Sequence, residues 1–207
     1  RGLGDVYKRQ AYKGFNGNLT CTRGQGTYQY APGETYYTDE SQTARKGFHC
    51  CENPLDCLRW YGLPLGAESN RLFIVEAAGD IDEIEDKIAC TQITLIKELD
   101  LKNLVIEVMK YIIMHPHRDW TGRGKLYEVA ENVAEALSKG FAIARGINPI
   151  VKGEEGSVLG VLVEHPENPA EFIDAKVGVV GSELEPNRWY TVQDGEWRVV
   201  QYEEKIS

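Results

Sequence analysis

The sequence predicts an α+β protein: a small aromatic-rich N-terminal domain with a mixed sheet, two amphipathic helices, and a short C-terminal unit of β-solenoid-like and antiparallel β structure. Three observations lead to this prediction. Tyrosines are interspersed with glycines in the first part of the chain, apolar residues recur at helical spacing in the middle, and glycines recur among small and branched residues after Gly140. We therefore expect domains at 11–97, 98–139 and 140–207.

The first ten residues, RGLGDVYKRQ, are set apart from this scheme. They resemble a translated adapter of the kind found at the start of metagenomic reading frames, and such segments do not belong in an argument about the fold. We expect residues 1–10 to be a non-native leader and the natural protein to begin near Ala11.

Turn and cap signals predict the elements of the N-terminal domain. Pro32-Gly33 is typical of a turn between two short aromatic strands. Asn53-Pro54 is typical of a helix start, with Asn53 as the N-cap, and predicts two helical turns over 55–61. Strands are predicted at 28–30, 35–37, 71–77 and 87–96.

The two helices are predicted at 101–114 and 125–139. In each, apolar residues recur every three or four positions and would lie on one helical face. Gly140 stands where a C-terminal cap glycine of the second helix belongs. In the last part of the chain, Asp194-Gly195 predicts a β-hairpin, because both turn positions favour positive φ.

Composition excludes several classes of protein. With 42% hydrophobic and 27% charged residues, the chain has the composition of a folded globular protein. The net charge of −9 argues against binding a nucleic acid polymer or an anionic membrane, and no apolar run is long enough to span a bilayer. The chain contains no phosphate-binding loop, dinucleotide fingerprint, serine elbow or HExxH motif, so we expect no cofactor.

The stretch 47–61, GFHCCENPLDCLRWY, is the predicted functional surface. His49, Cys50, Cys51 and Cys57 carry groups that bind zinc, but adjacent cysteines and the gap before Cys57 do not match the paired spacing of a closed zinc site. On a strand His49 would share a face with Cys51 rather than Cys50, which disfavours a thiol activated by its neighbour. We therefore expect no metal site and no catalytic residue, and reduced thiols in a cytosol.

The same stretch is better suited to an anionic aromatic ligand. Arginines and Lys46 can pair with phosphate, aromatic rings can stack on a base, and the helix start offers backbone N–H groups. The alternative is that the aromatic residues form a core and the arginines are solvated. The predicted ligand-binding residues are His49, Arg59, Trp60, Tyr61, Arg45, Arg71, Tyr28, Tyr30 and Asn53.

Four segments, AYKGFN, YAPGETY, KGFHCCENPLDCLRWY and RLFIVEAAGDI, resemble a phage- and prophage-associated domain family of uncharacterised function, over roughly residues 11–94. In that family Gly-rich β-solenoid repeats and a short strand unit often follow, and WYTVQDGEW at 189–197 resembles the strand unit. The resemblance implies a protein that acts in the cytoplasm of a bacterial host cell.

A looser similarity links Gly-Glu-Thr-Tyr at 33–36, the spacing from Lys46 to Pro54 and the strand RLFIVE to the ADP-ribosyltransferase fold. Those enzymes carry Ser-Thr-Ser or a tyrosine near that strand, whereas this chain has His49-Cys50-Cys51, and no glutamate matches the catalytic one. The similarity implies a domain suited to holding an ADP-ribose-like ligand.

These observations lead us to expect a phage-type counter-defence protein that binds and sequesters a nucleotide-derived immune signal, of the cyclic ADP-ribose or cyclic nucleotide type, without catalysis. One rival is an ADP-ribosyltransferase-like or nucleotide-cleaving enzyme that uses His49, Arg59 and Glu76. A second is a structural, oligomerising interaction module. Each hypothesis includes a homo-oligomer built through the region after Leu101, because so short a solenoid fragment cannot bury its own faces.

Overall fold

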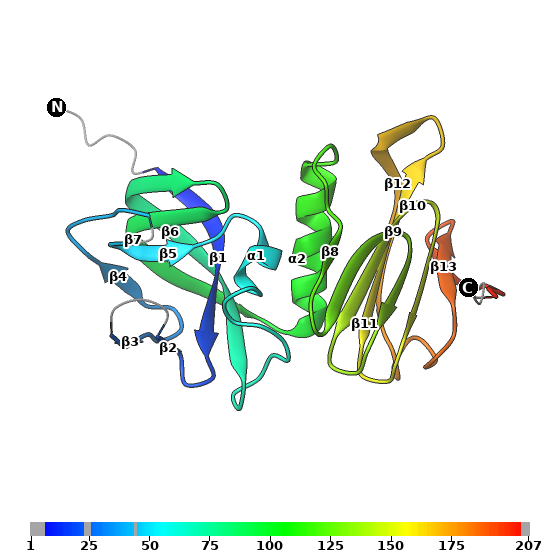
Figure 1. Cartoon of the computed structure of the whole chain (residues 1–207), viewed down its shortest axis with the longest axis horizontal. Coiled ribbons are helices and arrows are strands. Elements are labelled where there is room, and N and C mark those ends of the chain that lie inside the picture. Colours follow the sequence, from blue (N-terminus) through cyan, green and yellow to red (C-terminus); the bar gives the residue numbers. More distant parts are fainter. Residues whose placement is uncertain (1–6, 23–25, 44, 204–207) are drawn as a thin grey trace. The chain divides into compact units, whose positions relative to one another are not determined.

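The computed structural model describes residues 7–22, 26–43 and 45–203, and the chain divides into two compact units, Arg1–Asp100 and Leu101–Ser207 (Figure 1). The described residues are mostly in strands and include two helices, so the protein is mostly β rather than α+β. Neither helix is long and apolar enough to cross a membrane.

The described residues of the first unit form seven strands and one short helix. They are β1 (Lys8–Asn16), β2 (Thr20–Cys21), β3 (Tyr28–Gln29), β4 (Thr35–Tyr37), β5 (Phe48–Cys50), α1 (Pro54–Cys57), β6 (Asn70–Ile84) and β7 (Lys87–Leu99). An antiparallel sheet has the order β1-β6-β7-β4, with β5 also paired to β7. The strands predicted at 71–77 and 87–96 are confirmed within β6 and β7. The two short aromatic strands pair with other partners, β3 with β2 and β4 with β7, rather than with each other.

The aromatic residues of this unit form much of its core. The ring of Phe15 lies 5.1 Å from that of Tyr30 and 5.5 Å from that of Phe73, both in edge-on geometry. All three side chains are buried, together with Ile93 and Leu95 of β7. Aromatic pairs in this geometry add stability beyond the burial of their area.

Helix α1 begins where the sequence predicted. The Oδ1 atom of Asn53 accepts a hydrogen bond from the backbone N–H of Leu55 at 3.0 Å, and Pro54 is the first helical residue. The helix ends at Cys57, one turn earlier than expected, and Tyr61 then packs directly on β1. Gly14 permits this contact, because a Cβ atom at that position would lie 2.7 Å from the Cβ of Tyr61.

The predicted leader overlaps β1. Residues 1–6 lie outside the described part of the chain, whereas Lys8, Arg9 and Gln10 pair with Ala78, Ala77 and Glu76 of β6. The residues expected to be non-native therefore extend the edge strand of the first sheet.

The second unit contains a helix and seven strands. They are α2 (Leu101–Met114), β8 (Gly122–Arg123), β9 (Tyr127–Ala136), β10 (Phe141–Gly153), β11 (Val158–His165), β12 (Asn168–Val179), β13 (Tyr190–Gln193) and β14 (Glu196–Val199). One mixed sheet has the order β12-β11-β10-β13-β14, and β9 joins β10 and β8. Helix α2 is confirmed at its predicted bounds, and it approaches β11 at Gly160, where a Cβ atom would lie 2.6 Å from the sulfur of Met109.

The second amphipathic helix, expected at 125–139, is wrong. Residues 127–136 form β9, which pairs in parallel with β10. The register of this pairing is irregular next to Asn132, a residue with φ of 65°. The valines and alanines of this stretch fit a helix by spacing, but Ala134 and Ala136 are also alternate residues that face the core of the sheet. Pairing with a strand that follows in sequence outweighs the helical preference of the alanines and glutamates.

The C-terminal unit combines two kinds of pairing. Phe141 of β10 pairs in parallel with Tyr127 of β9 on one side and Val158 of β11 on the other. Strands β12, β13 and β14 join the sheet antiparallel, and Asp194-Gly195 forms the predicted hairpin with positive φ at both residues. The antiparallel part is therefore confirmed, whereas the β-solenoid stays a prediction.

Candidate functional site

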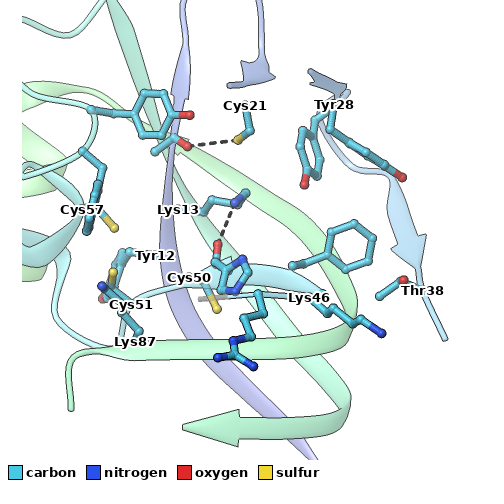
Figure 2. A pocket seen from close by; sticks show the side chains of 18 of the residues that line it. Tyr12, Lys13, Cys21, Tyr28, Thr38, Lys46, Cys50, Cys51, Cys57 and Lys87 are labelled. Atoms are coloured by element: carbon cyan, nitrogen blue, oxygen red, sulfur yellow. Dashed lines mark hydrogen bonds between the residues drawn. The ribbon is translucent and has the colours of Figure 1, made fainter. Parts of the chain in front are cut away.

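A cavity of about 1140 Å³ lies in the first unit, between β1, β5, the α1 region and the segments that carry β2 to β4 (Figure 2). Four cationic side chains line it: Lys13, Arg45, Lys46 and Lys87. None of the described residues that line it is acidic, although the whole chain carries a net charge of −9. The lining also includes six aromatic residues with polar edges, namely Tyr12, Tyr28, Tyr30, Tyr37, Trp60 and Tyr61.

Lys13 lies in the middle of this lining (Figure 2). The residue lies on β1 and is only 8% exposed, and the Nζ atom of Lys13 donates a hydrogen bond to the backbone carbonyl of His49 at 2.7 Å. The Nζ also lies 5.6 Å from the ring centres of both Phe15 and Tyr30. Within the described chain Lys13 has no ion pair with a carboxylate. Buried charges in proteins are normally paired, so this ammonium is suited to an anionic ligand.

His49 is half-buried on β5, between Phe48 and Cys50, which lie in the core. Burial lowers the pKa of His49, and the positive charge of Lys13 lowers it further, while a hydrogen bond with the backbone of Gln42 opposes these effects. The imidazole is therefore held neutral at pH 7 and can donate or accept a hydrogen bond at the cavity wall.

Two thiols at the cavity, those of Cys50 and Cys57, are shielded rather than activated. A hydrogen bond to Cys90 and then burial raise the pKa of the Cys50 thiol, and a hydrogen bond to Cys51 and then burial raise that of Cys57. Cys50 also lowers the pKa of Cys90 through their hydrogen bond, but Cys90 is fully buried and does not line the cavity. A thiol held protonated is a poor nucleophile.

The described residues contain no group of three or more His, Cys, Asp or Glu side chains arranged to hold a metal ion. The cysteines of the described chain are all free thiols. The local chemistry is therefore that of cations, phenols, an indole and a neutral imidazole.

Six of the nine predicted ligand-binding residues line the cavity. These are His49, Trp60, Tyr61, Arg45, Tyr28 and Tyr30. Tyr30 is also part of the core, where burial raises the pKa of its phenol. Tyr30 therefore belongs both to the cavity lining and to the aromatic core, and a ligand-binding role for these residues stays a prediction.

The other three predicted residues have partners elsewhere. Arg71 makes a two-pronged ion pair with Glu98 at 2.6 and 2.9 Å. Arg59 bonds to Asp86 at 3.0 Å, and the side chain of Asn53 caps α1. None of the three is among the lining residues. Glu76, a candidate of the enzyme hypothesis, forms an ion pair with Lys8 at 3.0 Å and does not line the cavity either.

Sequence reasoning missed Lys13, Lys87 and Tyr12. Lys13 and Tyr12 belong to β1, which is far from the stretch 47–61 in sequence. The strand meets this stretch through the bridge between Tyr12 and Cys51, the hydrogen bond from Lys13 to the carbonyl of His49, and the packing of Tyr61 on Gly14. The spacing of charged residues along β1 did not indicate that this strand would contact the stretch 47–61. An available signal was the lysine inside the otherwise apolar pattern AYKGF, since a lysine flanked by buried positions is unusual.

A family model described as "Domain of unknown function (DUF7666)" matches residues 9–107. The matched segment includes every residue that lines the cavity. No curated protein and no solved structure matches the chain. The expected similarity to an uncharacterised domain family is therefore supported for this part of the chain, and its phage association and its likeness to ADP-ribosyltransferases stay predictions.

Proposed function

We propose that the first unit binds and sequesters a nucleotide-derived anion, as a phage counter-defence protein would do to a nucleotide immune signal of a bacterial cell. The observation that carries the proposal is the composition of the cavity: four cations, six polar aromatic residues and no carboxylate among the described lining residues of an acidic protein. The cations can pair with a phosphate group, and the aromatic rings can stack on a base.

Lys13 is the anchor in this proposal. Its ammonium has three N–H donors, and the carbonyl of His49 accepts one of them. A phosphate oxygen could accept from the others and would provide the opposite charge that no described carboxylate provides to this buried cation. Hydrogen bonds between charged partners are shorter and stronger than neutral ones.

Binding without turnover is the form of the proposal that the site supports best. The thiols of Cys50 and Cys57 are held protonated. Among the described lining residues, none is a carboxylate that could act as a general base or as the catalytic glutamate of a transferase. His49 has a lowered pKa, caused first by burial, and it already has a hydrogen bond with the backbone of Gln42. These features favour a holder over an enzyme.

Isothermal titration calorimetry with ADP-ribose, cyclic ADP-ribose and a set of cyclic mono- and dinucleotides tests the proposal. We expect at least one of them to bind, and mass spectrometry of the ligand recovered after denaturation should show it unchanged. Absence of binding across the whole set would overturn the proposal. Release of a cleaved product, or mass added to the protein after incubation with NAD, would favour the enzyme hypothesis instead.

A further inference from the structure

Residues that line the cavity lie on two sides of Lys13. Figure 2 shows Lys87, Cys51 and Cys57 on one side of it and Tyr28, Thr38 and Lys46 on the other. This separation divides the lining into two flanks with a buried cation between them.

Each flank combines an exposed ring with a cation. On the first, the Nζ of Lys87 lies 4.8 Å from the centre of the Trp60 ring, and Trp60 is 42% exposed. On the second, Tyr37 directly precedes Thr38 on the chain and is 71% exposed, and Lys46 forms an ion pair with Glu40. Each flank therefore presents an exposed ring on which a base can stack. Lys87 already contacts the Trp60 ring and Lys46 is paired with Glu40, so the rings rather than these two cations define the flanks.

The size of the cavity agrees with a ligand that reaches both flanks. Pockets for single small molecules usually enclose about 300–1,000 Å³. The volume here, about 1140 Å³, exceeds that range. A nucleotide with one base would leave one of the two aromatic flanks without a partner.

We propose that the cavity binds a nucleotide with two bases joined by a central phosphate bridge, an inference that rests on the proposed function. The bridge lies at Lys13, one base lies on Trp60, and the other lies on the flank of Tyr37 and Tyr28. A linear dinucleotide and a cyclic dinucleotide share this chemistry.

Two probes that differ only in the second base test the inference. Diadenosine diphosphate and ADP-ribose carry the same bridging diphosphate, but only the first has a base at each end. Stacking of one base on an aromatic side chain changes affinity by roughly 5- to 150-fold. We expect calorimetry to show diadenosine diphosphate binding at least about tenfold more tightly than ADP-ribose. Cyclic di-AMP, added as a third probe, distinguishes a cyclic from a linear two-base ligand.

Variants at the two flanks identify the source of that preference. Trp60→Ala and Tyr37→Ala should each reduce it to less than about twofold, because either change removes one of the two stacking surfaces. Tyr7→Ala is the matched control, since Tyr7 is 67% exposed and lies outside the cavity lining, and it should keep the full preference.

The outcomes separate this inference from the proposed function. If ADP-ribose binds as tightly as both two-base probes, the two-base inference is wrong and the nucleotide-binding proposal stands. A preference that survives both flank variants would also overturn it. If none of the three probes nor any member of the earlier set binds, the proposed function itself fails.

Discussion

Replacing Lys13 by methionine tests the centre of the proposed site. Methionine keeps an unbranched side chain of similar length in the buried position on β1 and removes the charge. A hydrogen bond that involves a charged group contributes roughly 1.5–3 kcal/mol, so the dissociation constant of a bound nucleotide should rise about 10- to 150-fold. Calorimetry with the best ligand of the panel measures this change.

Lys8→Met is the matched control, because Lys8 lies on the same strand, is largely exposed and pairs with Glu76 outside the cavity. It should leave affinity unchanged, which separates a local effect of Lys13 from a general loss of positive charge. A Lys13→Met protein that unfolds at the same temperature as the wild type and binds ligand equally well would refute the role of Lys13.

The same variant has a second, ligand-independent signature at His49. The charge of Lys13 is the second cause, after burial, of the lowered pKa of His49. Its removal should move that pKa upward while burial still holds it below the ordinary value. NMR titration of the imidazole resonances, assigned with a His49→Gln variant, measures the shift, and an unchanged pKa would contradict the contact between the two residues.

Other predictions concern stability, assembly and pH. Gly14→Ala should destabilise the first unit by about 1–3 kcal/mol in denaturant unfolding, because the new methyl group displaces Tyr61; equal stability would contradict the close packing. In the second unit, Glu164→Gln should destabilise more than a double Arg145→Met/Glu164→Met variant, since it leaves a mostly buried guanidinium without its 2.5 Å ion-pair partner. Light scattering should give the mass of a homo-oligomer, and a monomer would refute that expectation. Because its folded pKa is lowered, His49 should contribute stability that is complete above about pH 6.5 and falls as the pH drops from there towards the folded pKa, and His49→Gln should weaken that dependence.

Local signals in the sequence predicted local structure well. The Asn53 cap, the Pro54 helix start and the Asp194-Gly195 hairpin each depend on residues within a few positions, and each is present. Helix α2 was predictable for a similar reason, because the residues of its apolar face all lie within one uninterrupted segment of the sequence. These features need no knowledge of distant partners.

The features that depend on distant partners were the ones missed. Strand β9 has a sequence compatible with a helix, and its pairing with β10 decides the outcome. Lys13 lies at the site because β1 is bridged to Cys51 and the carbonyl of His49 accepts a hydrogen bond from the Lys13 ammonium. Arg71 and Arg59 looked equally suited to phosphate, and nothing in the sequence showed that Glu98 and Asp86 would engage them.

The acidity of the chain and the cations of the cavity are compatible, because they act over different distances. At physiological ionic strength the field of a surface charge is screened within about 8 Å, so a ligand inside the cavity experiences mainly Lys13 and its neighbours. A polyanion that extends beyond the cavity would instead meet the acidic remainder of the protein, which carries the net charge of −9. Under the proposed function, the same charge distribution would favour small nucleotides that fit within the cavity and disfavour nucleic acid polymers. If this reasoning holds, raising the salt concentration should reduce this discrimination, because screening weakens the repulsion of the polymer more than the contacts to a partly buried phosphate.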